Sequence, residues 1–160
     1  MSDVLVGIAL GSNLGDREAE LDAAIEFLRL LTTDDVVRES PRIETAPVGC
    51  PPGSPPFLNS VAEIEVDTVL MPPLNLIGCL QEFEEERGRS PLADANAPRT
   101  LDLDIIYYGV EQFDQMGLVI PHPRAHLRRF VLEPLSHLRP DLILPGQTKT
   151  VAEILTELRN

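Results

Sequence analysis

The spacing of apolar residues along the chain predicts alternating strands and helices. Residues 3–10 are mostly apolar and residues 57–67 alternate in polarity, and both patterns are typical of strands. In residues 16–31, apolar side chains recur at helical spacing, and a proline pair at Pro72 suits the first turn of a second helix. The predicted strands cover residues 3–10, 36–45, 57–67 and 100–108, and the predicted helices cover residues 16–31 and 72–87.

The C-terminal part adds shorter elements. Residues 118–120 are predicted as a short strand, and residues 130–138 as a helix that Pro134 interrupts. Thr150 and Glu153 form a capping-box pattern at the start of a last helix. The order strand, helix, strand, strand, helix, strand predicts an α+β fold, a ferredoxin-like sandwich with a mainly antiparallel sheet and helices packed on it. Without internal repeats or a linker, residues 1–160 are expected to form a single domain.

Composition narrows the class of protein. A chain that is 43% hydrophobic and 24% charged is typical of a soluble globular protein. No apolar run approaches the roughly 20 residues that span a membrane, and the first residues lack the pattern of a signal peptide, so a cytoplasmic protein is expected. The net charge of −13 argues against binding to nucleic acid or to an anionic membrane. We expect a monomer.

Two long segments rich in proline and glycine are predicted as loops, at residues 46–56 and 88–98. Loops of this length within a compact domain are often functional. The second loop leads directly into a strand that carries two carboxylates, so Arg89 within the loop and Arg99 directly after it become candidates for binding a phosphate group.

Asp102 and Asp104 are the strongest chemical signal in the sequence. Successive side chains of a strand point to opposite faces, so these two carboxylates share one face, with Cβ atoms roughly 6–7 Å apart. Leu103 and its apolar neighbours Leu101 and Ile105 take the other face. A pair of like charges at this spacing suits one or two Mg²⁺ ions, although a solvated face of an edge strand is the alternative when the pair is considered alone.

The residues around the pair resemble a known family. Ala-Pro-Arg-Thr-Leu-Asp-Leu-Asp-Ile-Ile (residues 97–106) resembles the signature of the 6-hydroxymethyl-7,8-dihydropterin pyrophosphokinase family. Further similar segments occur in the family's order at residues 11–15, 45–49, 57–59, 121–124 and 128–132. The resemblance implies an enzyme of folate biosynthesis that transfers pyrophosphate from ATP to the hydroxymethyl group of 6-hydroxymethyl-7,8-dihydropterin and releases AMP.

The resemblance also implies roles for individual residues. Asp102 and Asp104 would hold two Mg²⁺ ions, with Arg89 and Arg99 stabilising the transferring group, and Asp102 is the candidate general base. The residues expected to bind ATP are Gln81, Arg89, Arg99, Ile105, His122 and Arg128. Those expected to bind the pterin are Thr45, Pro47, Val48, Phe57, Asn59 and Phe130. Asn13 and Glu84 are expected to support the site from behind these residues.

The types of residue in the pterin set match the chemistry of the ligand. A pterin is a flat ring with an amide-like edge, so it needs aromatic faces, which Phe57 and Phe130 can supply, and paired hydrogen-bonding groups such as those of Asn59. The chain departs from the common family pattern at Pro91, Asn96, Gly117 and Val119, which leaves the ATP contacts there open.

Two other classes of protein compete with this interpretation. A two-metal phosphohydrolase would use the same carboxylates with water as the nucleophile, but it would not need the slot formed by Phe57, Asn59 and Phe130. A ligand-binding module without catalysis would not need two carboxylates on one face.

Overall fold

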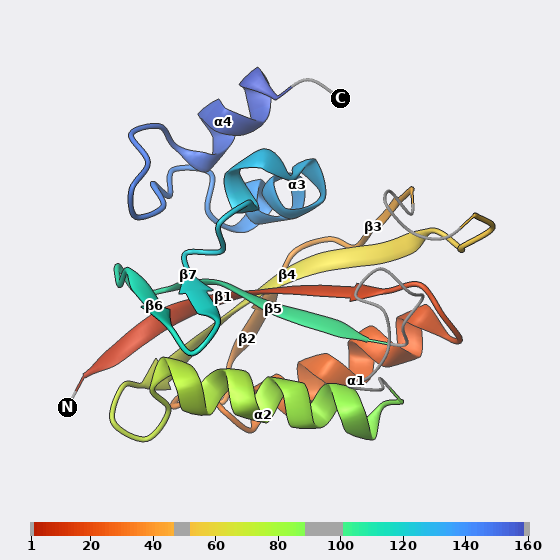
Figure 1. Ribbon diagram of the computed structural model, residues 1–160, viewed down its shortest axis with the longest axis horizontal. Helices are drawn as coiled ribbons and strands as arrows, with labels where there is room; N and C mark the ends of the chain where they lie inside the picture. The colour runs from red at the N-terminus through yellow and green to blue at the C-terminus, as the bar shows by residue number, and fades with distance from the viewer. Residues whose placement is uncertain (1, 47–51, 89–100, 159–160) are drawn as a thin grey trace.

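The computed structural model describes residues 2–46, 52–88 and 101–158 (Figure 1). Within these ranges the chain forms a five-stranded antiparallel sheet, a two-stranded sheet and helices on both faces of the larger sheet. The strands are β1 (Asp3–Ser12), β2 (Val37–Glu39), β3 (Ile43–Thr45), β4 (Phe57–Asp67), β5 (Asp102–Tyr108), β6 (Phe113–Gln115) and β7 (Leu118–Ile120). The helices are α1 (Arg17–Arg29), α2 (Pro73–Glu86), the 3₁₀ turn η1 (Ala125–Leu127), α3 (Arg129–Leu138) and α4 (Val151–Glu157).

The sheet is built around the long antiparallel pair of β1 and β4. The strand order is β2-β4-β1-β5, and β3 pairs with β4 beyond the end of β2. At the end of β1, Gly11 lies opposite Asn59 of β4 on one side and Asp102 of β5 on the other. The pairing therefore brings three segments that are distant in the sequence to one end of the sheet.

Both faces of the sheet are covered, each by its own apolar cluster. Helices α1 and α2 lie on one face, and α3 and α4 lie on the other (Figure 1). The first cluster joins residues such as Ile8, Leu21 and Leu80, and the second joins Val61, Tyr107 and Leu132. The predicted α+β fold with a mainly antiparallel sheet is confirmed, and the C-terminal helices supply a second covered face.

Three predicted elements differ in detail. The single strand predicted at residues 36–45 is two short strands, because Pro41 lies between them and has no N–H to donate to β4. Strand β1 continues through Gly11 to Ser12, because β4 pairs with both residues and β5 also pairs with Gly11. Helix α3 continues through Pro134, with Leu132 and Leu135 buried around it, so burial of this face compensates for the lost hydrogen bond.

The start of the last helix, α4, follows its sequence. The capping box predicted at Thr150 is present, with the Thr150 side chain accepting from the Glu153 N–H and Glu153 accepting in return. Among the helices of the described residues, none is long and apolar enough to cross a membrane.

Candidate active site

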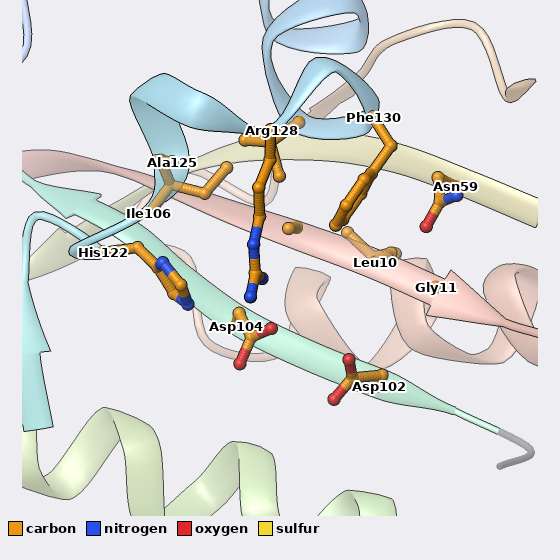
Figure 2. Close-up of a pocket in the computed structure, with 12 residues that line it drawn as sticks. Leu10, Gly11, Asn59, Asp102, Asp104, Ile106, His122, Ala125, Arg128 and Phe130 are labelled. Carbon is orange, nitrogen blue, oxygen red and sulfur yellow. The ribbon is translucent and has the colours of Figure 1, made fainter. Parts of the chain in front are cut away.

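A hollow lies between the ends of β1 and β5 and the segment that leads into α3 (Figure 2). The space between its lining residues amounts to about 360 Å³, a value that includes open solvent. Its lining comprises Ala9, Leu10, Gly11, Asn59, Asp102, Asp104, Ile106, His122, Ala125, Arg128, Phe130 and Val131. The structure thus brings together carboxylates, a cation, an imidazole and an aromatic ring that the sequence analysis assigned to one site.

The two aspartates lie on the face of β5 that the strand pattern predicts. Asp102 and Asp104 are half-buried and line the hollow. Leu103 and Ile105 are buried in the cluster on the opposite face, beneath α1 and α2. The side chain of Ile105 therefore points away from the hollow, and a contact of this residue with ATP could involve only its backbone.

Glu84 supports the aspartate strand from that opposite face. This residue belongs to α2 and its side chain is buried. One of its carboxylate oxygens accepts a hydrogen bond of 2.6 Å from the backbone N–H of Leu103. Leu103 lies between the two aspartates in sequence, so this bond fixes the strand directly behind them. The position agrees with the supporting role predicted for Glu84.

Arg128 and Phe130 come from the start of α3. Figure 2 shows the Arg128 side chain reaching toward Asp104, with His122 on one side and Phe130 on the other. The Arg128 guanidinium carbon lies 5.5 Å from the centre of the Phe130 ring, which is a cation–π distance. The Phe130 side chain is partly exposed, so its ring is available to a ligand in the hollow.

His122 is held in a defined orientation beside β5. Its backbone N–H donates to the Ile106 carbonyl over 2.9 Å, and its Nδ1 accepts from the Arg124 backbone N–H over 3.2 Å. Burial lowers the pKa of His122, Arg128 and Arg124 lower it further, and Asp102 acts in the opposite direction. The neutral ring then carries its proton on Nε2 and can donate one hydrogen bond to an anionic ligand.

Of the pterin-binding residues predicted on β3 and β4, Asn59 lines the hollow at the end near Gly11, whereas Thr45 and Phe57 are not among the lining residues. The Asn59 side-chain amide donates a 2.5 Å hydrogen bond to the Thr45 hydroxyl, which fixes the orientation of the amide. Gly11 lies opposite Asn59, and a Cβ there would be 2.9 Å from Asn59 Oδ1 and 3.5 Å from the Phe57 ring. Gly11 was not among the predicted site residues, because its importance depends on strand register.

A small polar network holds the segment that precedes Phe57. The Asn13 side chain donates to the Pro55 carbonyl over 3.2 Å, and Arg17 donates to the Pro56 carbonyl over 3.0 Å. Arg17 also forms a 2.7 Å ion pair with Glu44 of β3. The position of Asn13 therefore agrees with the supporting role predicted for it. In the sequence, Arg17 and Glu44 could not be distinguished from ordinary surface charges.

Some predicted site residues lie elsewhere. Gln81 is on the exposed side of α2, which covers the face of the sheet opposite α3, and it does not line the hollow. The predicted roles of Pro47, Val48, Arg89 and Arg99, and the departures at Pro91 and Asn96, lie outside the described residues.

The carboxylates of the hollow suit Mg²⁺ that arrives with a phosphate ligand. The described residues contain no group of three or more His, Cys, Asp or Glu side chains that could hold a metal ion. Mg²⁺ is commonly bound by one or two carboxylates, with phosphate oxygens and water completing its octahedral shell. Asp102 and Asp104 provide such a pair, so the donor set fits this ion.

Taken together, an antiparallel α+β fold and a hollow with two carboxylates, a guanidinium and an exposed ring are typical of a small phosphoryl-transfer enzyme. A family model described as 7,8-dihydro-6-hydroxymethylpterin-pyrophosphokinase (HPPK) matches residues 7–140. The chain belongs to this family.

Individual relatives agree with the family match. The 2-amino-4-hydroxy-6-hydroxymethyldihydropteridine pyrophosphokinase of Haemophilus influenzae is 40% identical over 151 residues, which are 94% of this chain and 88% of the relative. The enzyme of the same name from Pseudomonas aeruginosa is 40% identical over 141 residues, covering 88% of this chain and 83% of the relative. The Folic acid synthesis protein fol1 of Schizosaccharomyces pombe is 36% identical over 151 residues, which are 94% of this chain but only 20% of that much longer relative. The family and the enzyme class predicted from the sequence, a pyrophosphokinase, are confirmed.

Proposed function

We propose that this chain transfers the pyrophosphoryl group of ATP to the hydroxymethyl group of 6-hydroxymethyl-7,8-dihydropterin, with AMP as the second product, as a step of folate biosynthesis. The observation that carries the proposal is the shared hollow, in which Asp102 and Asp104 lie at one end and Asn59 at the other, with Arg128 and Phe130 from α3 above them. A hydrolase would need the carboxylates alone, and the second set of residues supports a flat organic acceptor.

The pterin is assigned to the end of the hollow near Gly11. There the Asn59 amide, oriented by Thr45, would pair with the amide-like edge of the ring, and Phe130 would cover one ring face. Phe57, next to Gly11, is proposed for the other face. The roles of Pro47 and Val48 in the same slot stay predictions.

The triphosphate is assigned to the end of the hollow that carries charge. Asp102 and Asp104 would hold two Mg²⁺ ions, which would orient the phosphates and offset charge on the attacking and leaving oxygens. Arg128 would bind a phosphate oxygen directly, and His122 would donate from Nε2. Arg89 and Arg99 are proposed to add further positive charge, as in the sequence-based prediction.

The chemistry follows from this arrangement. The hydroxymethyl oxygen of the pterin forms a bond to the β-phosphorus of ATP, while the bond between that phosphorus and the oxygen bridging to the α-phosphorus breaks. AMP leaves with that oxygen, and the hydroxyl proton passes to a base, for which Asp102 is the candidate. Positioning and fixed charge supply most of the catalysis in such reactions, because the protein forms no covalent bond to the substrate.

An omission series tests the function. ATP consumption is measured with the complete mixture, without the pterin, without Mg²⁺ and without protein. The proposed transfer predicts consumption only in the complete mixture. Consumption that continues without the pterin would favour a phosphohydrolase, and binding of both ligands without any consumption would favour a binding module.

The expectations of a cytoplasmic monomer, of one domain over residues 1–160, and of no nucleic-acid or membrane partner stay predictions. Size-exclusion chromatography with light scattering measures the oligomeric state directly.

A further inference from the structure

Glu63 is a buried charge outside the hollow, in the middle of β4. Its side chain is 0% exposed, and both carboxylate oxygens are engaged. One oxygen accepts from the Tyr107 hydroxyl and, over 2.6 Å, from Nη1 of Arg139. The other oxygen accepts from Arg38 of the edge strand β2. Because an unpaired buried carboxylate is very unfavourable, these three partners are needed to keep the charge inside the protein.

Two of the three partners, which do not themselves line the hollow, lie on β5 and at the C-terminal end of α3, the two elements whose other residues form its walls. Tyr107 follows Ile106, which lines the hollow on the same strand as Asp104. Arg139 follows the last residue of α3, whose first turn carries Phe130. One carboxylate oxygen therefore bonds the strand wall and the helix wall together, on the face that α3 covers (Figure 1).

The strand wall is irregular where Tyr107 joins it. Gly7 of β1 lies opposite Tyr107 and Ile8 lies opposite Ile105, so Ile106 is an extra residue, as in a β-bulge. The bulge lets both Ile106 and Tyr107 face the α3 side, where both belong to the second apolar cluster. The Tyr107 ring occupies the space above Gly7, where a Cβ would lie 2.2 Å from a ring carbon.

The hydroxyl of Tyr107 stays a donor over the physiological pH range. Burial raises the pKa of Tyr107 to about 12, although the nearby Arg139 and Arg38 lower it. The stability of the fold does not by itself require such a network of buried charges, since apolar groups often replace buried ion pairs without loss of stability. A directed set of bonds does, however, fix the relative position of the elements that it joins.

We propose that Glu63 is a positioning residue, which sets the separation between the wall that carries Asp102 and Asp104 and the wall that carries Arg128 and Phe130. The proposal rests on the proposed function of the hollow. Helix α3 has ten residues and so extends for about 15 Å. A small shift of its C-terminal end, once Arg139 is released, would therefore move Phe130 and Arg128 at its other end.

The test compares two partners of the same carboxylate. Arg139→Met releases α3, whereas Arg38→Met, the matched control, removes a cation that touches neither wall. For both variants and for Arg139→Lys and Tyr107→Phe, kcat and KM for AMP formation are measured, together with the unfolding temperature. Calorimetry with the pterin and with a non-hydrolysable ATP analogue plus Mg²⁺ gives a readout that is independent of turnover.

The expected result is a selective loss. Arg139→Met lowers kcat about tenfold, less than the roughly hundredfold that a 1 Å misplacement can cost, and Arg139→Lys restores most of it. Arg38→Met keeps kcat within about twofold at a comparable loss of stability. Equal losses in both arginine variants, or wild-type kcat in Arg139→Met, would overturn the proposal.

Two further measurements separate the possible failures. If Arg139→Met does not fold, the Tyr107→Phe variant decides, because it removes one hydroxyl and keeps the ring. A lower kcat or weaker pterin binding in this variant would support the proposal. Wild-type values for both would overturn it. If the wild-type protein forms no AMP, the proposed function fails, and the affinities for the pterin and the ATP analogue in the two arginine variants still test the positioning role.

Discussion

The guanidinium carbon of Arg128 lies 5.5 Å from the centre of the Phe130 ring. These residues are two positions apart at the start of α3, so a single turn of chain places a cation and a ring face side by side, which we propose for the phosphate and the pterin. In the proposed function, the phosphate and pterin subsites would therefore share a boundary at these two residues, where the acceptor hydroxyl would meet the phosphate.

The first prediction concerns this ring. Phe130→Leu keeps an apolar side chain but removes the aromatic face, whose stacking is worth roughly 0.5–1.5 kcal/mol beyond burial. The dissociation constant for the pterin should therefore rise about two- to tenfold in calorimetry, with little change for the ATP analogue. Phe27→Leu is the matched control, because Phe27 stacks on Phe83 with ring centres 4.2 Å apart, under the other face of the sheet. An effect on ATP alone would mean that the subsites are assigned the wrong way round.

The second prediction concerns the carboxylates. Asp102→Asn and Asp104→Asn each remove a proposed ligand of Mg²⁺ and should lower kcat about 10²–10³-fold, or ~3–4 kcal/mol of barrier. Both are half-buried, so the variants should fold normally. Asp114→Asn on the exposed part of β6 serves as the control. Near-normal turnover of both aspartate variants across a Mg²⁺ titration would contradict the metal assignment.

The third prediction tests the close approach of β1 to β4. In Gly11→Ala the new Cβ would lie 2.9 Å from Asn59 Oδ1, so the amide must turn away from the position in which Thr45 holds it. Pterin affinity should fall by roughly 5- to 150-fold, because an unpaired polar edge costs about 1–3 kcal/mol. Gly78→Ala within α2 meets no atom within 4 Å and should stabilise the protein by up to about 1 kcal/mol. Unchanged pterin binding in Gly11→Ala would remove Asn59 from the pterin slot.

The fourth prediction concerns the support behind the aspartates. Glu84→Ala removes the acceptor of the Leu103 N–H, a buried bond of 2.6 Å, and should lower the free energy of unfolding by about 1–3 kcal/mol. Glu82→Ala, on the exposed side of the same helix, should have little effect in the same denaturant titration. Because β5 carries Asp102 and Asp104, we also expect lower affinity for Mg²⁺ with the ATP analogue. A stability loss with wild-type affinity would limit Glu84 to holding the fold.

Local patterns were sufficient to predict part of the site. The shared face of Asp102 and Asp104 follows from the two-residue period of a strand. The apolar residues that alternate with them, such as Leu103, are buried as that period requires. The capping box at Thr150 is likewise a local signal. The places of Asn59 and Phe130 came from the family motifs, which already contain the long-range pairing that brings them together.

Features that depend on register or on distant partners could not be predicted in this way. Glu63 bonds to residues 25, 44 and 76 positions away, and nothing in its own segment distinguishes it from a solvated strand residue. The bulge at Ile106 is visible only once Gly7 and Ile8 are paired. Gly11 lies just beyond the strand predicted at residues 3–10, and its close contact with Asn59 arises across two strands and leaves no local signal.

The central claim is the transfer of two phosphoryl groups together, and phosphorus NMR of the reaction mixture tests it most directly. An ordinary kinase leaves ADP, whereas attack on the β-phosphorus leaves AMP. With Mg²⁺, ATP and the pterin alcohol, AMP and a pterin diphosphate should accumulate one for one, without ADP, and Asp104→Asn should slow the growth of both signals about 10²–10³-fold. ADP together with a pterin monophosphate would contradict pyrophosphoryl transfer, and free phosphate with unmodified pterin would indicate a phosphohydrolase instead.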